Sequence, residues 1–127
     1  MNFGKTSESD EQQMLFQWAS IMARRVPELG LLFHIPNGGA RSKATAGKLK
    51  AEGVKTGVPD LCLPVARGGY HGLFIELKVG TNKPSPSQNE WLAALAKEGY
   101  RAEVCYGWHA ASQVIEKYLK GAILRED

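Results

Sequence analysis

The chain has 127 residues, a length that fits one domain with one hydrophobic core. Hydrophobic residues make up 43% of it and charged residues 23%, which excludes a disordered or fibrous protein. The net charge of +3 is too small to identify a partner. No apolar run approaches the roughly 20 residues that span a bilayer, and the segment MNFGKTSESDEQQ lacks the apolar stretch of a secretory signal. We therefore expect a cytosolic protein without a membrane partner.

Residues 9–25 carry apolar side chains at helical spacing, which predicts an amphipathic helix. Ser9 followed by Gln12 matches a capping box at its start, and Pro27 is expected to end it. Residues 31–35 form a short apolar run and predict a strand. The apolar face of the helix consists of Met14, Leu15, Trp18, Ile21 and Met22.

A glycine-containing loop and a basic segment follow. Asn37-Gly38-Gly39 predicts a loop, and residues 42–51 predict a short helix that ends at Gly53. The basic residues of this region are Arg41, Lys43, Lys48, Lys50 and Lys55. Such a local excess of positive charge can bind phosphates, although it can equally be a solvated surface. The candidate nucleic-acid contacts are Asn37, Arg41, Lys43 and Lys48, because a glycine loop exposes backbone N–H groups beside basic side chains.

Two predicted strands form a hairpin at the centre of the chain. They cover residues 60–65 and 72–79, and the pair Gly68-Gly69 between them marks a turn. Cys62 and Cys105 lie within apolar runs and have no metal-ligand spacing. We therefore expect both cysteines to be buried, reduced thiols on strands.

The C-terminal part predicts a helix, a strand and a helix. Ser87 and Glu90 match a capping box for a helix that ends at Gly99. Residues 101–106 predict a strand, and residues 108–119 predict the last helix. The whole order is αβαββαβα, which predicts an α/β fold with a mixed sheet of about four strands flanked by helices.

The strand at residues 72–79 alternates between two faces. Leu73, Ile75 and Leu77 lie on one face, and Phe74, Glu76 and Lys78 lie on the other. Glu76 and Lys78 are therefore neighbours, about 7 Å apart at Cα. Asp60 begins the antiparallel partner strand, directly after Gly57-Val58-Pro59, so the hairpin can bring its carboxylate beside Glu76.

These three residue types suit one kind of chemistry. Two carboxylates at the end of a sheet repel each other unless a cation lies between them, and oxygen ligands with positions left for water suit Mg²⁺. A lysine beside them can orient or help to deprotonate a water molecule and can offset charge on a phosphoryl oxygen. Glu-x-Lys alone is common on solvated strand faces. Its combination with Asp60 favours metal-assisted phosphodiester hydrolysis.

Several motifs of the chain together resemble one known family. The motifs are IPNGG at residues 35–39, GVPDL at 57–61, FIELK at 74–78, SPSQNEW at 85–91 and Gly99-Tyr100. They resemble the VRR-NUC (virus-type replication-repair nuclease) family, a branch of the PD-(D/E)xK nuclease superfamily. The resemblance extends from the first helix to about Leu119. It implies a single domain with a restriction-endonuclease-like core over residues 1–127, structured at about 9–120.

The resemblance also implies roles for particular residues. Asp60 and Glu76 would bind Mg²⁺ or Mn²⁺ together with the main-chain carbonyl of Leu77, and Lys78 would be the catalytic lysine. Gln88 would support the lysine and the attacking water. An N-terminal glutamate of the family points into the metal site and would complete the catalytic and ligand sets.

Glu11 matches that N-terminal glutamate, and Glu8 and Asp10 compete for the role. Glu11 lies one helical turn before Leu15 and two before Trp18, on the inward side of the helix, which favours it. An acid at a helix start can instead serve only the helix dipole.

The resemblance favours a structure-selective DNA endonuclease like the Holliday-junction resolvases. Symmetric cutting of a four-way junction implies branched DNA as substrate and a homodimer. No nucleotide cofactor is expected, because Gly47-Lys48 lacks the rest of a Walker A motif. The alternatives are a catalytically silent nucleic-acid-binding module of a replication or repair assembly and a monomeric flap or single-strand nuclease. The expected location is the cytoplasm, that of a bacterial host if a phage encodes the protein.

Overall fold

A computed structural model describes residues 6–36 and 42–126 of the chain. Its elements are α1 (Glu8–Met22), the 3-10 helix η1 (Pro27–Leu31), β1 (Phe33–His34), α2 (Lys43–Ala51), β2 (Leu61–Leu63), β3 (Leu73–Lys78), α3 (Pro86–Lys97), β4 (Arg101–Tyr106) and α4 (Trp108–Leu119). This is the predicted order of helices and strands, with η1 added. None of the described helices is long and apolar enough to cross a membrane.

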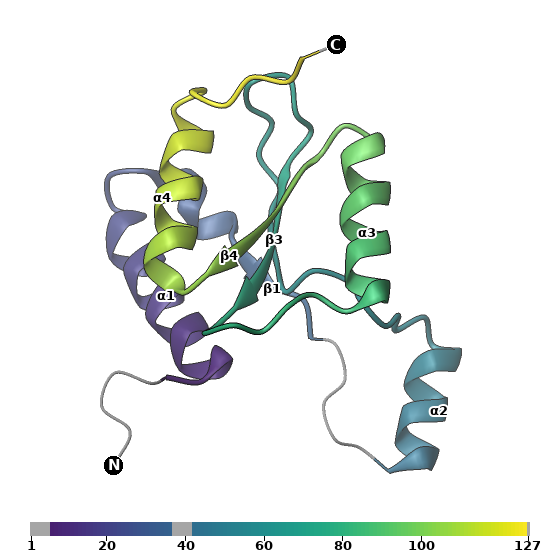
Figure 1. The fold of residues 1–127 in the computed structure, drawn as a ribbon. Coiled ribbons are helices and arrows are strands. Elements are labelled where there is room, and N and C mark those ends of the chain that lie inside the picture. The colour runs from purple at the N-terminus through teal and green to yellow at the C-terminus, as the bar shows by residue number, and fades with distance from the viewer. Residues whose placement is uncertain (1–5, 37–41, 127) are drawn as a thin grey trace.

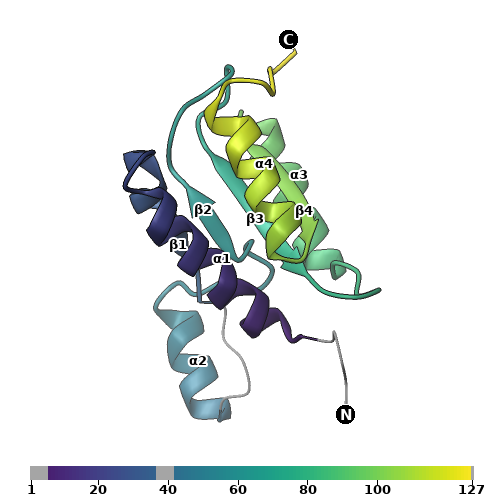
Figure 2. The same ribbon diagram turned by 90° about the vertical axis from the view of Figure 1, so that its left-hand side faces the viewer.

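The four strands form one mixed sheet in the order β1-β2-β3-β4. β1, β2 and β3 pair antiparallel, and β4 pairs parallel to β3 after the crossover through α3. Helices α1 and α4 cover one face of the sheet, and α3 covers the other (Figures 1 and 2). The predicted α/β fold with a mixed, helix-flanked sheet is therefore confirmed. β3 ends at the same end of the sheet at which α1, α3 and α4 begin (Figure 1).

The hairpin between β2 and β3 turns at the predicted glycine pair. Gly68 and Gly69 have φ values of +59° and +90°, which residues with a Cβ rarely adopt. Arg67 and Tyr70 exchange backbone hydrogen bonds of 3.2 and 2.8 Å across the turn. Both strands are shorter than predicted at their ends, but their pairing is the one that the turn implies.

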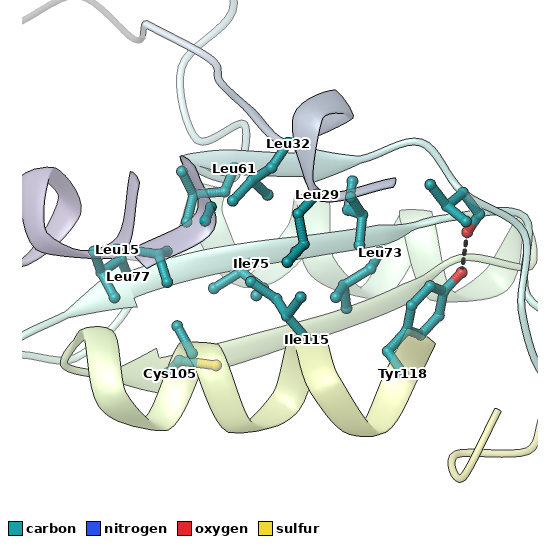
Figure 3. Packing of buried hydrophobic residues seen from close by; sticks show 14 residues of the cluster. Leu15, Leu29, Leu32, Leu61, Leu73, Ile75, Leu77, Cys105, Ile115 and Tyr118 are labelled. Carbon is teal, nitrogen blue, oxygen red and sulfur yellow. Dashed lines mark hydrogen bonds between the residues drawn. The ribbon is translucent and has the colours of Figure 1, made fainter. Parts of the chain in front are cut away.

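The core lies between the sheet and the pair α1 and α4 (Figure 3). The side chains of Leu73, Ile75 and Leu77 point into it, as their alternation predicts, and each is about 1% exposed. The Tyr118 hydroxyl donates a 2.6 Å hydrogen bond to the carbonyl of Val65, so the polar end of this buried ring is satisfied. The core also includes Leu15, Leu29, Leu61, Cys105 and Ile115. Cys62 and Cys105 are buried and free, as expected.

The predicted helix caps are wrong by two residues in both α1 and α3. Ser7, not Ser9, caps α1, and Asp10 completes that capping box. The physical reason is that Ser7 and Ser9 are both followed three residues later by a side chain that can complete a capping box. The carboxylate of Asp10 accepts the hydrogen bond from the backbone N–H of the cap as well as the amide of Gln12 would. α1 also ends at Met22, three residues before the predicted end.

In α3, Ser85 is the cap and Gln88 its capping-box partner, in place of Ser87 and Glu90. Pro86 occupies the first helical position, where its fixed φ suits a helix start and its missing N–H costs nothing. The shift is relevant to function, because it places Gln88 at a fixed point in the first turn of α3.

β1 is shorter than predicted, and α2 lies outside the hydrophobic core. β1 contains only Phe33–His34, because Leu31 belongs to η1. α2 has Ser42 as its N-cap, so it begins one residue after the predicted start, ends at the predicted Ala51 and contains no buried residue. It extends away from the sheet on the side where β3 ends (Figures 1 and 2). The predicted Asn37-Gly38-Gly39 loop lies outside the described residues.

Candidate active site

Asp60, Glu76 and Lys78 come together at one end of the β2–β3 pair. The register Leu61↔Ile75 places Asp60 opposite Glu76, and cross-strand partners share a face of the sheet. The Oδ2 atom of Asp60 accepts a 2.8 Å hydrogen bond from the backbone N–H of Leu77. The Nζ atom of Lys78 lies 3.6 Å from Oε2 of Glu76. The hairpin thus brings together the three residues that alternation and turn position predict.

The backbone before Asp60 is fixed from two sides. Gly57 has a φ of +93°, and a Cβ at this position would lie 2.7 Å from the backbone carbonyl carbon of Ser87 in α3. The carbonyl of Asp60 accepts hydrogen bonds from the backbone N–H of Ile35, at 2.7 Å, and from Nδ1 of His34, at 2.9 Å. Gly57 therefore lets the loop before Asp60 lie close to the start of α3, and the hydrogen bonds from His34 and Ile35 hold Asp60 from the side of β1.

Glu76 is a buried carboxylate with two unequal oxygen atoms. Its side chain is only 1% exposed. Oε2 accepts a 3.3 Å hydrogen bond from Nε2 of Gln88 and faces the ammonium of Lys78. Oε1 is buried and has no hydrogen-bond partner among the described residues. A buried carboxylate oxygen without a partner costs free energy, so its persistence calls for a ligand or a proton.

The pKa of Glu76 reflects the same environment. Burial raises it to about 8, helped by the neighbouring carboxyl group of Asp60, whereas the charge of Lys78 lowers it. A proton shared between two neighbouring carboxyl groups is one way to relieve their repulsion, and a divalent cation is another. The site therefore resists holding two negative charges unless a cation compensates them.

The residues present fit a hard divalent cation. Asp60 and Glu76 supply two carboxylates, and Oε1 of Glu76, which has no hydrogen-bond partner among the described residues, can serve as an oxygen ligand. Among residues 6–36 and 42–126, no cluster of three or more His, Cys, Asp and Glu side chains is placed to bind a metal. A cation here would complete its shell with carbonyl oxygens and water, which is the ligand set that Mg²⁺ accepts.

The chain matches one protein-family model and a solved structure. The sequence model of the VRR-NUC domain matches residues 7–109 of the chain. A solved structure titled "VRR_NUC domain protein" is 35% identical, superimposes with a TM-score of 0.79, and the alignment covers 94% of this chain and 93% of that one. No curated protein matches significantly. This chain belongs to the VRR-NUC family.

The VRR-NUC match covers every residue of the predicted catalytic set, since residues 7–109 include both the N-terminal acids and Gln88. The family assignment and the fold that the sequence motifs imply are thus confirmed, and the domain is of the nuclease type. The metal-binding and catalytic roles of the individual residues, including the main-chain carbonyl of Leu77, stay predictions.

The N-terminal acids of this VRR-NUC domain are distributed differently from the expectation. Glu11 is half-buried, and its Oε1 atom accepts a 2.9 Å hydrogen bond from the backbone N–H of Trp108 at the start of α4. The negative charge of Glu8 raises the pKa of Glu76, so Glu8 acts on that carboxyl group. Asp10 caps α1. The structure thus gives Glu11 a contact with α4, and its predicted metal role is still untested.

The candidate nucleic-acid contacts lie on and before α2. Lys43 and Lys48 are exposed on this helix, which carries no acidic residue in its first turn. Asn37 and Arg41 lie outside the described residues.

The sequence interpretation missed Tyr106. This residue is the register partner of Lys78 and is 45% exposed. Tyr106 lies beside Lys78 because β4 pairs parallel to β3 in this register. That register cannot be predicted from the sequence, so the sequence pattern could not place Tyr106 at the site.

Proposed function

We propose that this VRR-NUC domain is a divalent-metal-dependent endonuclease that hydrolyses phosphodiester bonds in DNA. The observation that carries the proposal is the state of Glu76. Its Oε1 atom is buried without a partner beside the carboxylate of Asp60, while Lys78 and Gln88 occupy the side of Oε2. A carboxylate pair of this kind has no evident structural benefit, because burial and mutual repulsion both oppose its ionisation.

Each side chain has a defined task in the proposed reaction. A bound Mg²⁺ or Mn²⁺ would supply Lewis-acid polarisation of the phosphodiester and neutralise the carboxylates. Asp60 and Glu76 would hold it, and the hydrogen bond from Leu77 N–H fixes the orientation of Asp60. Lys78, buried beside Glu76, would orient the attacking water and donate a hydrogen bond to a non-bridging phosphate oxygen.

Gln88 holds the carboxylate of Glu76 in place. Its Oε1 atom accepts from the backbone N–H of Ser85 at 2.8 Å, and its Nε2 atom donates to Oε2 of Glu76. The side-chain amide is thereby oriented by the capping box of α3. This arrangement leaves Oε1 of Glu76 free for a cation and keeps Lys78 and Gln88 on the other oxygen.

The proposed substrate is branched DNA, in the manner of a Holliday-junction resolvase. A resolvase needs two active sites related by a two-fold axis, so the proposed working form is a homodimer. The extended, basic α2 supports contact with DNA outside the cut. Its lysines Lys43, Lys48 and Lys50 are exposed, and the helix stands on the side of the molecule where β3 ends (Figure 1).

A cleavage assay tests the proposal. Purified protein is incubated with Mg²⁺ or Mn²⁺ and with labelled four-way junction, flap, single-stranded and duplex DNA. We expect the wild type to cut branched DNA and Lys78→Ala to lose at least about 100-fold in rate, because positioned proton-transfer and electrostatic groups contribute on this scale. Lys117→Ala on α4, an exposed lysine far along the chain from the site, is the matched control and should cut normally.

The outcomes separate the levels of the proposal. Absence of cutting with either metal would overturn the enzyme assignment, and binding without cutting would indicate a silent nucleic-acid-binding module. Cutting of single strands as fast as junctions would overturn the resolvase part only. Light scattering on the same sample tests the homodimer.

A further inference from the structure

Tyr106 lies beside the proposed catalytic lysine on the last residue of an edge strand. β4 is the outer strand of the sheet, and Tyr106 pairs with Lys78 across the parallel ladder. Neighbouring strands are about 4.8 Å apart, and paired residues project from the same face. The tyrosine ring therefore starts from the face of the sheet that carries Glu76 and Lys78.

Tyr106 is tethered at its hydroxyl and yet partly open to solvent. The Tyr106 hydroxyl donates a 2.8 Å hydrogen bond to the main-chain carbonyl of Asn82, in the loop between β3 and α3. This bond fixes the far end of the side chain, while 45% of the residue remains exposed. Tyr118 shows the contrasting case, because its hydroxyl is also bonded but its ring is fully buried in the core. Tyr106 thus presents an aromatic surface at the rim of the site without contributing to the core.

We infer that Tyr106 is a stacking platform for an unpaired nucleobase next to the phosphodiester held at Asp60, Glu76 and Lys78. The inference rests on the proposed function and deepens it, because it names the feature of the substrate that the site recognises. Every nucleobase has a π-face that can stack on an aromatic ring. A base inside a duplex has both faces covered by its neighbours and must leave the stack to reach the protein. The site therefore takes DNA in which the nucleotide beside the cut is unpaired, as at a branch point or flap.

A simpler role for the ring is to cover the aliphatic stem of Lys78. Long side chains on neighbouring strands commonly pack in this way. The two roles differ in what can replace the tyrosine. A leucine can cover a lysine stem, whereas stacking requires an aromatic ring. They also differ in the substrate, because a cover for Lys78 affects paired and unpaired DNA equally.

Fluorescence and binding measurements distinguish these roles. The flap DNA carries 2-aminopurine at the unpaired position next to the cut. Stacking quenches the emission of this base. A fully paired duplex with the same label is the reference. Binding is measured in Ca²⁺ for the wild type, Tyr106→Leu, Tyr106→Phe and Tyr106→Trp. We expect Tyr106→Leu to bind the flap about 5- to 100-fold more weakly, the effect of losing one base–aromatic stack. Phenylalanine and tryptophan should retain binding and quenching, and affinity for the duplex should not change.

Two results would overturn the inference. One is equal flap binding by the wild type and Tyr106→Leu. The other is an equal loss for flap and duplex, which is what a cover for Lys78 predicts. If Tyr106→Leu does not fold, the Tyr106→Trp variant decides, because loss of quenching by a folded protein with a larger ring contradicts stacking.

Cutting of the same DNA in Mg²⁺ separates the platform proposal from the nuclease proposal. A wild type that quenches 2-aminopurine without cutting supports the platform and contradicts the nuclease, whereas cutting that Tyr106→Leu leaves unaffected contradicts only the platform.

Discussion

Glu76 is the residue at which folding and the proposed activity oppose each other. Its carboxyl group is 1% exposed, and burial together with Asp60 raises its pKa to about 8 from an ordinary value of 4.5. A carboxyl with a raised pKa in the folded state favours folding while it is protonated. Its contribution is fully present below pH 4.5 and is lost as the pH rises through about 8. The protein thus gives up stability near neutral pH to keep an ionisable carboxylate in the site.

Replacing Glu76 with glutamine should reverse this loss in metal-free protein. Glutamine keeps the shape and stays neutral at every pH, so Glu76→Gln should gain stability relative to the wild type as the pH rises from 4.5 to about 8. Thermal unfolding in EDTA between pH 5 and 9 measures the difference. The exposed Glu116→Gln on α4 is the control and should follow the wild type. Parallel curves for the wild type and Glu76→Gln would contradict the raised pKa.

At the scale of elements, the site depends on how closely the loop before β2 approaches α3. Gly57 permits that approach in two ways, through its φ of +93° and through the absence of a Cβ that would meet the backbone of Ser87 at 2.7 Å. Gly53 has a similar φ of +104° but has no atom within 4 Å of the corresponding position. A substitution at Gly53 would therefore introduce backbone strain alone, whereas one at Gly57 would introduce both backbone strain and a steric clash.

Gly57→Ala should destabilise the protein more than Gly53→Ala. Both substitutions place a side chain at an unfavourable φ, which costs about 1–3 kcal/mol, but only Gly57→Ala also pushes the loop away from α3. The displacement should move Asp60 from Glu76 and lower the rate of cutting as well. Chemical denaturation and the cleavage assay provide the two measurements. Equal losses of stability in both variants would show that crowding at Ser87 has no effect.

Much of the element scale was predictable from periodicity and turn residues. β4 and α4 have the predicted bounds, and the Gly68-Gly69 turn fixes the β2–β3 register that brings Asp60 to Glu76. The caps were not predictable, because α1 and α3 each have two serines, two residues apart, that could start the helix. The family resemblance assigns Gln88 to the support of Lys78 and the attacking water, and neither it nor any pattern predicted the contact of Gln88 with Glu76. Helical facing favoured Glu11 over Glu8, but it could not predict that Glu11 binds the backbone of α4 while the charge of Glu8 acts on Glu76.

At the scale of the whole molecule, the proposed cation site joins parts of the chain that are distant in sequence. Asp60 precedes β2, Glu76 lies in β3, and Gln88 begins α3, so a cation held by the two carboxylates would link the hairpin and, through Gln88, the helix behind it. A ligand that binds only the folded state raises the melting temperature in proportion to the logarithm of its concentration above its Kd. Binding at this one site should therefore be visible in the unfolding of the entire domain.

The most direct measurement is the melting temperature during a Mg²⁺ titration at pH 8. The melting temperature of the wild type should rise with the logarithm of the Mg²⁺ concentration above the Kd. Asp60→Asn should show no such rise, because it lacks one of the two carboxylates that hold the cation. Glu116→Gln removes an equal charge from the exposed surface of α4 and should rise like the wild type. An equal rise in Asp60→Asn and the wild type would contradict a cation site between Asp60 and Glu76, and with it the proposed mechanism.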